Sequence, residues 1–194
     1  RQIAGFGPKA LTLVEVSEYA LYEIDLAIRE SHPALPCQAV LADIRDRDRI
    51  SRVIAEARPE LVFHAAALKH VPLVEDNPLE GILTNAVGTR NVADAARAAD
   101  ARVVVLISTD KAVNPSSVMG AAKRLAEMYF QALDARRAQE GKGTRFVTVR
   151  FGNVLGSTGS VVPLFRRQLE RGGPLTVTHP DMQRYFMTVA EAVS

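Results

Sequence analysis

The residues best suited to acid–base chemistry in this sequence lie in one stretch of its second half. Thr109, Asp110 and Lys111 come after Ser108, which ends a valine-rich apolar run with the composition of a buried strand. They place a hydroxyl, an acid and a base together at the end of that strand. Met119 and Lys123 are four residues apart, so on a helix they share one face. Lys123 could then reach a ligand bound near Thr109, although an isolated lysine at such a spacing is more often a solvated surface charge.

Strand-like and helix-like segments alternate along the chain and must position these residues. Short apolar runs typical of buried strands occur at 11–16, 39–42, 61–63, 103–107, 146–149 and 175–177. Segments with helical periodicity or helix start signals occur at 17–29, 46–57, 77–99, 118–138 and 161–169. Strands joined by helical crossovers pair in parallel, and right-handed crossovers place helices on both faces of the sheet. The pattern therefore predicts an α/β fold with a doubly wound parallel sheet of the Rossmann type.

Ligands bind beyond the carboxyl ends of the strands in such a sheet, so the residues that follow each strand carry the binding hypotheses. Glu15 ends one strand, where a carboxylate can accept hydrogen bonds from an adenosine ribose or only stabilise the next helix. Asp43, which precedes Ile44, could meet an adenine amino group or cap a turn. The small Ala65 and Ala66 allow a flat cofactor to lie against the backbone, and tight helix packing would explain them equally well.

Composition narrows the class of protein. The 194 residues are 47% hydrophobic and 24% charged, which is typical of a globular domain. The 24 Lys and Arg against 22 Asp and Glu leave a net charge of +2, so nucleic acid is not an expected partner. The chain contains no apolar run of about 18 residues, so no membrane contact is expected from this segment. One cysteine excludes an internal disulfide framework, and the four histidines lack paired metal-ligand spacing, so no metal is expected.

The glycine-rich phosphate loop that usually follows the first strand of a Rossmann-type fold is absent from this chain. Gly5 and Gly7 follow no strand and are interpreted as a helix C-terminus. We therefore expect the first strand and its glycine loop upstream of Arg1, in a longer protein. Residues 1–150 are expected to form a dinucleotide-binding domain truncated at its N-terminus, and the glycine-rich 151–194 the start of a substrate-binding region.

Six motifs, in order, cover most of the chain. They are FHAAALKHVP (63–72), TNAVGT (84–89), STDKAVNP (108–115), VMGAAK (118–123), RFGNVLG (150–156) and HPDMQRYFMT (179–188). Together they resemble the polysaccharide-biosynthesis, CapD-like branch of the extended short-chain dehydrogenase/reductase superfamily, which contains nucleotide-sugar 4,6-dehydratases acting on UDP-N-acetylglucosamine. Besides the absent glycine loop, the Tyr-x-x-x-Lys of the superfamily is replaced by Met119-x-x-x-Lys123, a substitution that this branch shows itself.

The resemblance implies an internal redox cycle with NAD or NADP as cofactor and UDP-N-acetylglucosamine or a related UDP-sugar as substrate. Hydride would leave C4, the C5 proton and the C6 hydroxyl would then be lost, and the hydride would return to C6. The product would be a UDP-4-keto-6-deoxy-N-acetylhexosamine for surface polysaccharide or glycan biosynthesis.

The resemblance also assigns roles to the residues at 109–123. Lys111 would be the C5 base, Asp110 the acid at C6, and Thr109 the residue that holds the C4 hydroxyl. Lys123 would bind the nicotinamide ribose. Met119 takes the place of the tyrosine but cannot accept a proton, because a thioether is only a weak acceptor. The acceptor of the C4 proton therefore stays open between Thr109, Asp110, a water and the cofactor ribose.

Four further residues enter only through the motifs. Lys69 and Asn85 are expected on the nicotinamide side, Lys69 also touching substrate, while Asn153 and Arg184 would contact the UDP group. A planar guanidinium suits a diphosphate, since it can bind two oxygens at once. Each of three residues also has a plainer interpretation. Lys69 could be a lysine at the rim, Asn85 an asparagine bonded to helix backbone, and Arg184 a solvated surface charge.

Several alternatives stay open. The same site could serve a 5-inverting dehydratase or a C4 epimerase, or the segment could bind a nucleotide-sugar without turning it over. Met119 disfavours a tyrosine-dependent epimerase, and Glu15 favours NAD over NADP because a carboxylate repels a 2′-phosphate. The expected location is cytoplasmic, or the cytoplasmic face of the inner membrane if transmembrane helices lie upstream. A homo-oligomer is also open, since relatives often oligomerise.

Overall fold

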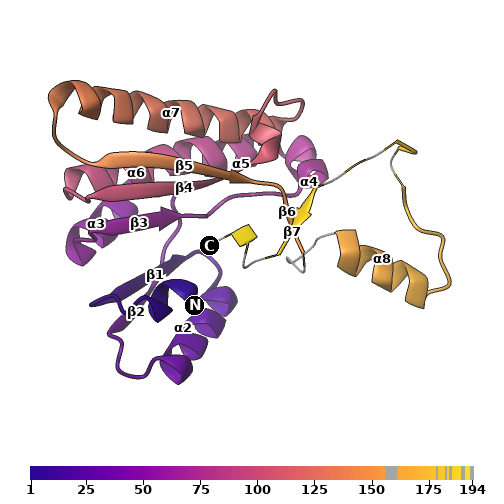
Figure 1. The fold of residues 1–194 in the computed structure, drawn as a ribbon, viewed down its shortest axis with the longest axis horizontal. Coiled ribbons are helices and arrows are strands. Elements are labelled where there is room, and N and C mark those ends of the chain that lie inside the picture. Colours follow the sequence, from indigo (N-terminus) through magenta and orange to yellow (C-terminus); the bar gives the residue numbers. More distant parts are fainter. Residues whose placement is uncertain (156–160, 178, 182, 184, 189–190, 193–194) are drawn as a thin grey trace.

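Parallel strands alternating with helices make up most of the chain (Figure 1). The computed structural model describes residues 1–155, 161–177, 179–181, 183, 185–188 and 191–192. The strands are β1 (Leu11–Glu15), β2 (Cys37–Leu41), β3 (Leu61–His64), β4 (Val103–Thr109), β5 (Arg145–Phe151), β6 (Asn153–Val154) and β7 (Phe186–Met187). The helices are α1 (Gln2–Gly5), α2 (Glu18–Ser31), α3 (Arg47–Ala57), α4 (Val71–Asp76), α5 (Pro78–Ile82), the π-helical η1 (Leu83–Gly88), α6 (Thr89–Ala98), the 3₁₀ turn η2 (Asp110–Ala112), α7 (Val118–Glu140) and α8 (Val161–Glu170).

The strands pair in parallel throughout the described part of the chain, which confirms the α/β prediction. β1 pairs with β2, β4 lies between β3 and β5, and β6 pairs with β7. Among the described residues, no ladder joins β1 to β3. In the Rossmann strand order the first strand lies between the second and the fourth, which correspond to β1 and β3 of this chain. The break between β1 and β3 therefore falls at the place of that first strand.

The largest core lies between β4 and the helices α6 and α7. Residues alternate along β4 between buried and half-buried positions, and Val104 and Leu106 point to the helices. Phe130 of α7 meets Phe146 of β5 edge to face, with the ring centroids 5.1 Å apart. The opposite face of the same sheet is less covered, since Phe63 is 50% exposed. The expected covering of both faces is therefore complete only on the α6–α7 side.

A second core connects the two main sheets. Ile50 and Ile54 of α3 pack with Val92 of α6 in one buried cluster. The half-buried Val40 of β2 and Val62 of β3 pack against this cluster. The helix pair α3–α6 therefore fixes the β1–β2 unit beside the β3–β4–β5 sheet, and with it the relative position of their carboxyl ends.

Local signals located most elements, and the exceptions have identifiable causes. The helix expected at 77–99 begins at Pro78 but passes through the π-helical turn η1. The Asn77 side chain does not cap it and donates instead to the Leu73 carbonyl. The strand expected at 175–177 does not form. The Gln168 side chain instead accepts a hydrogen bond from the Thr176 backbone N–H and donates one to the Thr176 hydroxyl, so that N–H is not available to a strand partner. In the described part of the chain, none of the helices is both long enough and apolar enough to cross a membrane.

Candidate functional site

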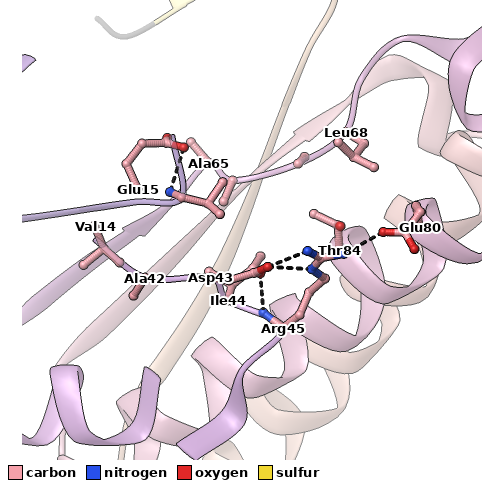
Figure 2. A pocket seen from close by; sticks show the side chains of 13 residues that line it. Val14, Glu15, Ala42, Asp43, Ile44, Arg45, Ala65, Leu68, Glu80 and Thr84 are labelled. Atoms are coloured by element: carbon pink, nitrogen blue, oxygen red, sulfur yellow. Dashed lines mark hydrogen bonds and ion pairs between the residues drawn. The ribbon is translucent and has the colours of Figure 1, made fainter. Parts of the chain in front are cut away.

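A cavity of about 480 Å³ lies at the carboxyl ends of β1, β2 and β3 (Figure 2). Its walls include all five residues proposed from the ends of the first three strand-like runs, namely Glu15, Asp43, Ile44, Ala65 and Ala66. A volume of about 300–1,000 Å³ is usual for a small-molecule site. The fold therefore brings together side chains that lie as far as 51 positions apart in the sequence. Lys69, Asn85 and Lys123 are not among the residues that line this cavity.

Glu15 is fixed by the backbone that follows it. Its Oε1 atom accepts hydrogen bonds from the backbone N–H groups of Val16, at 2.9 Å, and Ser17, at 3.0 Å. Ser17 caps α2, so Glu15 does support the start of that helix, as the plainer interpretation required. The second oxygen, Oε2, takes no part in these two bonds. The same carboxylate can thus order the turn and accept a ligand hydroxyl.

Asp43 is paired with Arg45, a residue that no sequence motif singled out. Its Oδ2 accepts from Nε of Arg45 at 2.7 Å, and its Oδ1 accepts from the Arg45 backbone N–H at 2.9 Å. Arg45 also bonds Glu80 of α5 at 2.6 Å (Figure 2). The Arg45 side-chain bond lowers the pKa of Asp43 against the opposing effect of burial. Asp43 is therefore an ionised, acceptor-only group at the cavity wall.

Two buried asparagines hold the loops that form the cavity. The Asn85 Oδ1 accepts from the Leu68 N–H, and its Nδ2 donates to the Leu68 carbonyl, both at 2.8 Å. Asn91 donates to the carbonyls of Ile44, at 3.0 Å, and Arg45, at 3.2 Å. Asn85 thus bonds the loop behind the cavity wall, and the structure does not show the direct exposure to a ligand that was expected. The sequence drew no attention to Asn91.

His64 continues this network at the end of β3. Its Nε2 lies 2.8 Å from the Thr89 hydroxyl, and that hydroxyl donates to the Asn85 carbonyl, also at 2.8 Å. Because the hydroxyl has only one proton to donate, His64 Nε2 must carry the proton of their shared hydrogen bond. Burial, with a smaller contribution from the charge on Lys123, lowers the pKa of His64 to about 3. His64 is therefore a neutral donor that fixes Thr89.

The predicted trio at the end of β4 is joined by hydrogen bonds. The Thr109 hydroxyl donates to Asp110 Oδ1 at 2.8 Å, and Lys111 Nζ donates to the same oxygen at 3.0 Å. Burial acts to raise the pKa of Asp110, but the bonds from Lys111 and Thr109 outweigh it and leave the pKa below its ordinary value. A hydroxyl and an ammonium therefore meet at one carboxylate oxygen.

Lys123 reaches the same strand end from α7. It is only 5% exposed, and its Nζ donates to the Ile107 carbonyl at 2.6 Å, two residues before Thr109. Burial lowers the pKa of Lys123 to about 8, against the opposing effect of the Glu127 carboxylate. Lys123 is thus not a solvated surface lysine. Met119, one turn earlier, is 4% exposed and is also enclosed.

The motif at 150–156 places an amide beside the trio. Asn153 Oδ1 lies 3.5 Å from Lys111 Nζ, and Asn153 Nδ2 donates to the Tyr185 carbonyl at 3.2 Å. The pairing of β6 with β7 brings these segments together (Figure 1). Asn153 therefore adjoins the proposed base. Arg184, the other residue proposed for the UDP group, lies outside the described residues, and Lys69 lies exposed between β3 and α4.

Comparison with known proteins identifies the family of this chain. Residues 1–194 match the family described as "Polysaccharide biosynthesis protein". The chain belongs to this family. The capsular polysaccharide biosynthesis protein CapD of Staphylococcus aureus is 50% identical to this chain over 193 residues, which are 99% of this chain and 32% of CapD. The resemblance to the CapD-like branch is therefore confirmed.

Two further relatives carry named activities. A UDP-N-acetylglucosamine 4,6-dehydratase (inverting) of Campylobacter jejuni is 39% identical over 160 residues, covering 81% of this chain and 47% of that protein. A UDP-glucose 4-epimerase of Rickettsia canadensis is 39% identical over 170 residues, which are 88% of this chain and 48% of that protein. The chain thus spans about a third to a half of the length of these relatives.

Solved structures agree on the fold. Pen from Bacillus thuringiensis superposes with a TM-score of 0.86 at 36% identity, over 98% of this chain and 58% of Pen. DesIV, a dTDP-glucose 4,6-dehydratase from Streptomyces venezuelae determined with NAD, superposes with a TM-score of 0.78 at 23% identity. The match covers 98% of this chain and 63% of DesIV. The second likeness supports the Rossmann-type architecture alone.

Proposed function

We propose that this chain is the catalytic core of a nucleotide-sugar 4,6-dehydratase that acts on UDP-N-acetylglucosamine. The observation that carries the proposal is the hydrogen-bonded trio of Thr109, Asp110 and Lys111 at the end of β4, next to the buried Lys123. A dehydration of this kind needs an acceptor for the C4 proton, an acid at C6 and a base at C5. The named activity of the Campylobacter relative supports the same substrate.

NAD or NADP bound at the strand ends would supply the hydride acceptor and donor for the cycle. The cavity fits such a cofactor because it combines small, backbone-lined walls at Ala65 and Ala66 with the acceptor groups Glu15 and Asp43. Glu15 would hold the adenosine ribose, and Asp43 an amino group of the adenine. Lys123 would hold the nicotinamide ribose. Solved structures of the same fold that contain NAD support NAD as the cofactor.

The contacts within the trio favour one route for the protons. Thr109 takes the C4 hydroxyl proton as its own passes to Asp110 Oδ1, along the bond that already joins them. Asp110 then gives that proton to the C6 hydroxyl, which leaves as water. Lys111 first releases one proton of its ammonium group to solvent, takes the C5 proton as the amine, later returns a proton to C5, and finally regains a proton from solvent. Each residue regains its starting proton count, and the enclosed Met119 thioether is needed at no step.

The test is product analysis with the full-length protein, UDP-N-acetylglucosamine and NAD in D2O, followed by NMR. The expected product is a 4-keto-6-deoxy sugar that carries deuterium at C5. Accumulation of the C4 epimer without a keto intermediate would replace the proposal with the epimerase alternative, which the Rickettsia relative supports. The C5 configuration in the same spectra separates a retaining from an inverting dehydratase, and the Campylobacter relative favours inversion.

A further inference from the structure

Glu127 of α7 is a fully buried carboxylate that the proposed chemistry does not use. Its side chain has no exposed surface, yet three side chains donate hydrogen bonds to it. Ser108 donates through its hydroxyl at 2.6 Å, Arg150 through Nε at 2.8 Å as well as through Nη2, and Arg124 at 3.2 Å. Burial alone would raise the pKa of Glu127, but these donors, Arg150 first, lower it to about 2. The Glu127 carboxylate is therefore ionised at neutral pH.

Two of the three partners of Glu127 lie at strand ends that lead to proposed site residues. Ser108 immediately precedes Thr109 on β4, and Arg150 lies three residues before Asn153 at the end of β5. Ser108 and Arg150 are also register partners in the parallel ladder. One carboxylate from α7 thus bonds both neighbouring strands at the point where each delivers its functional side chains.

Lys123 completes this arrangement from the preceding turn of α7. It bonds the Ile107 carbonyl, while Glu127, four residues on, bonds Ser108. The titratable and charged groups around this strand end are His64 of β3, Asp110 and Lys111 of η2, Arg124 and Glu127 of α7, and Arg150 of β5. Glu127 lies one helical turn from Lys123, both side chains are buried, and the Glu127 charge acts to raise the pKa of the Lys123 ammonium.

Stability alone does not explain a carboxylate at this position. Removing a charge from water is costly, and a well-packed apolar residue often replaces a buried ion pair without loss of stability. The fixed geometry of several donors around one carboxylate is what an apolar side chain cannot reproduce. The arrangement therefore points to a role in placing the strand ends.

We propose that Glu127 is a positioning residue that holds the ends of β4 and β5 over α7 and keeps the Lys123 ammonium charged. The positioning part rests on the proposed function, because the residues it places are those of the dehydration. The effect on Lys123 does not rest on that function, since it concerns two groups of the protein alone.

The experiment follows Lys123 directly, by NMR of the full-length protein labelled with 13C-lysine. The Lys123 signal is identified by its absence from Lys123→Arg, and the unchanged protein is expected to titrate near pH 8. In Glu127→Gln, which keeps the shape and removes the charge, the midpoint is expected to fall by about one pH unit. Glu140→Gln is the matched control, because it breaks an exposed ion pair with Arg136 on the same helix and should leave the midpoint unchanged.

A midpoint in folded Glu127→Gln equal to that of the unchanged protein would overturn the effect on Lys123. Glu127→Asp tests whether Glu127 positions the strand ends. This test does not depend on whether Glu127→Gln folds. Glu127→Asp keeps the charge on a shorter arm, so kcat should fall at least tenfold with KM little changed. Full kcat in Glu127→Asp would overturn positioning. Absence of dehydration by the unchanged protein would remove the proposed function but leave the Lys123 result intact.

Discussion

Gly120 of α7 packs directly against the backbone carbonyl of Lys111, and no side-chain carbon fits between them. The atom in the way is backbone, so it cannot rotate aside as the end of a side chain would. Because of this contact, the turn η2, which contains Asp110 and Lys111, packs against the first turn of α7. The close approach lets the proposed acid and base share the β4 end with Lys123.

Gly120→Ala is therefore expected to displace η2 and to lower turnover at least tenfold. Overpacking of this kind costs about 1–3 kcal/mol in the free energy of unfolding. Denaturant unfolding and steady-state kinetics measure the two effects. Ala121→Ser alters the adjacent exposed position and should change neither. Unchanged turnover in a folded Gly120→Ala would show that the position of η2 is not critical.

Asn85→Ala is expected to release the loop at Leu68 and weaken cofactor binding. It removes two hydrogen bonds of 2.8 Å to the Leu68 backbone, and the loss of each such bond costs about 0.5–1.5 kcal/mol. Calorimetric titration with NAD and denaturant unfolding give the two readouts. Asn77→Ala removes a comparable amide bond to the Leu73 carbonyl at an exposed position, and NAD affinity should there be preserved.

His64 makes stability depend on acid pH. Its pKa is about 3 in the folded protein and about 6.5 when unfolded, so the unfolded chain binds the extra proton between these values. Stability from this group is therefore complete above pH 6.5 and is lost as the pH falls towards 3. When the pH falls from 6.5 to 4.5, the free energy of unfolding should decrease by about 2–3 kcal/mol more in the unchanged protein than in His64→Gln.

Denaturant titrations at the two pH values measure this difference. His70→Gln, which removes an exposed histidine, is the control and should follow the unchanged protein. Equal losses in His64→Gln and the unchanged protein would mean that His64 is not held neutral by burial.

Glu15→Gln is expected to shift cofactor preference towards NADP. The amide oxygen can still accept from the backbone of Val16 and Ser17, so the turn is retained, while the charge that repels a 2′-phosphate is removed. The ratio of NADP to NAD dissociation constants should fall by about tenfold, or about 1.4 kcal/mol. Glu18→Gln, in the first turn of α2, should leave the ratio unaltered. An unaltered ratio in Glu15→Gln would place the ribose elsewhere.

Lys111→Ala is expected to abolish the exchange of the C5 proton with solvent while cofactor binding persists. No other group of the trio can then act as the C5 base, because Asp110 serves C6. NMR in D2O measures deuterium at C5, and Lys142→Ala, on the loop after α7, is the control. Undiminished deuterium in Lys111→Ala would remove the base assignment.

The amino-acid sequence by itself determined the parallel α/β architecture and most strand and helix positions. These depend on signals within a few residues, such as apolar runs and the N-caps Ser17, Asp46 and Ser117, whose side chains each accept a backbone N–H of the helix that follows. It also selected the residues at the strand ends, because parallel strands deliver their carboxyl ends to one edge.

Only the tertiary structure decided how those residues are held. Asn85 bonds Leu68, Arg45 bonds Glu80, and Glu127 bonds Arg150, across 17, 35 and 23 positions of the chain. No periodicity or capping rule relates residues so far apart, because such pairs form only after helices and strands have packed. Burial of Lys123 and His64, which sets their charge, likewise arises from neighbours that the chain brings together in three dimensions.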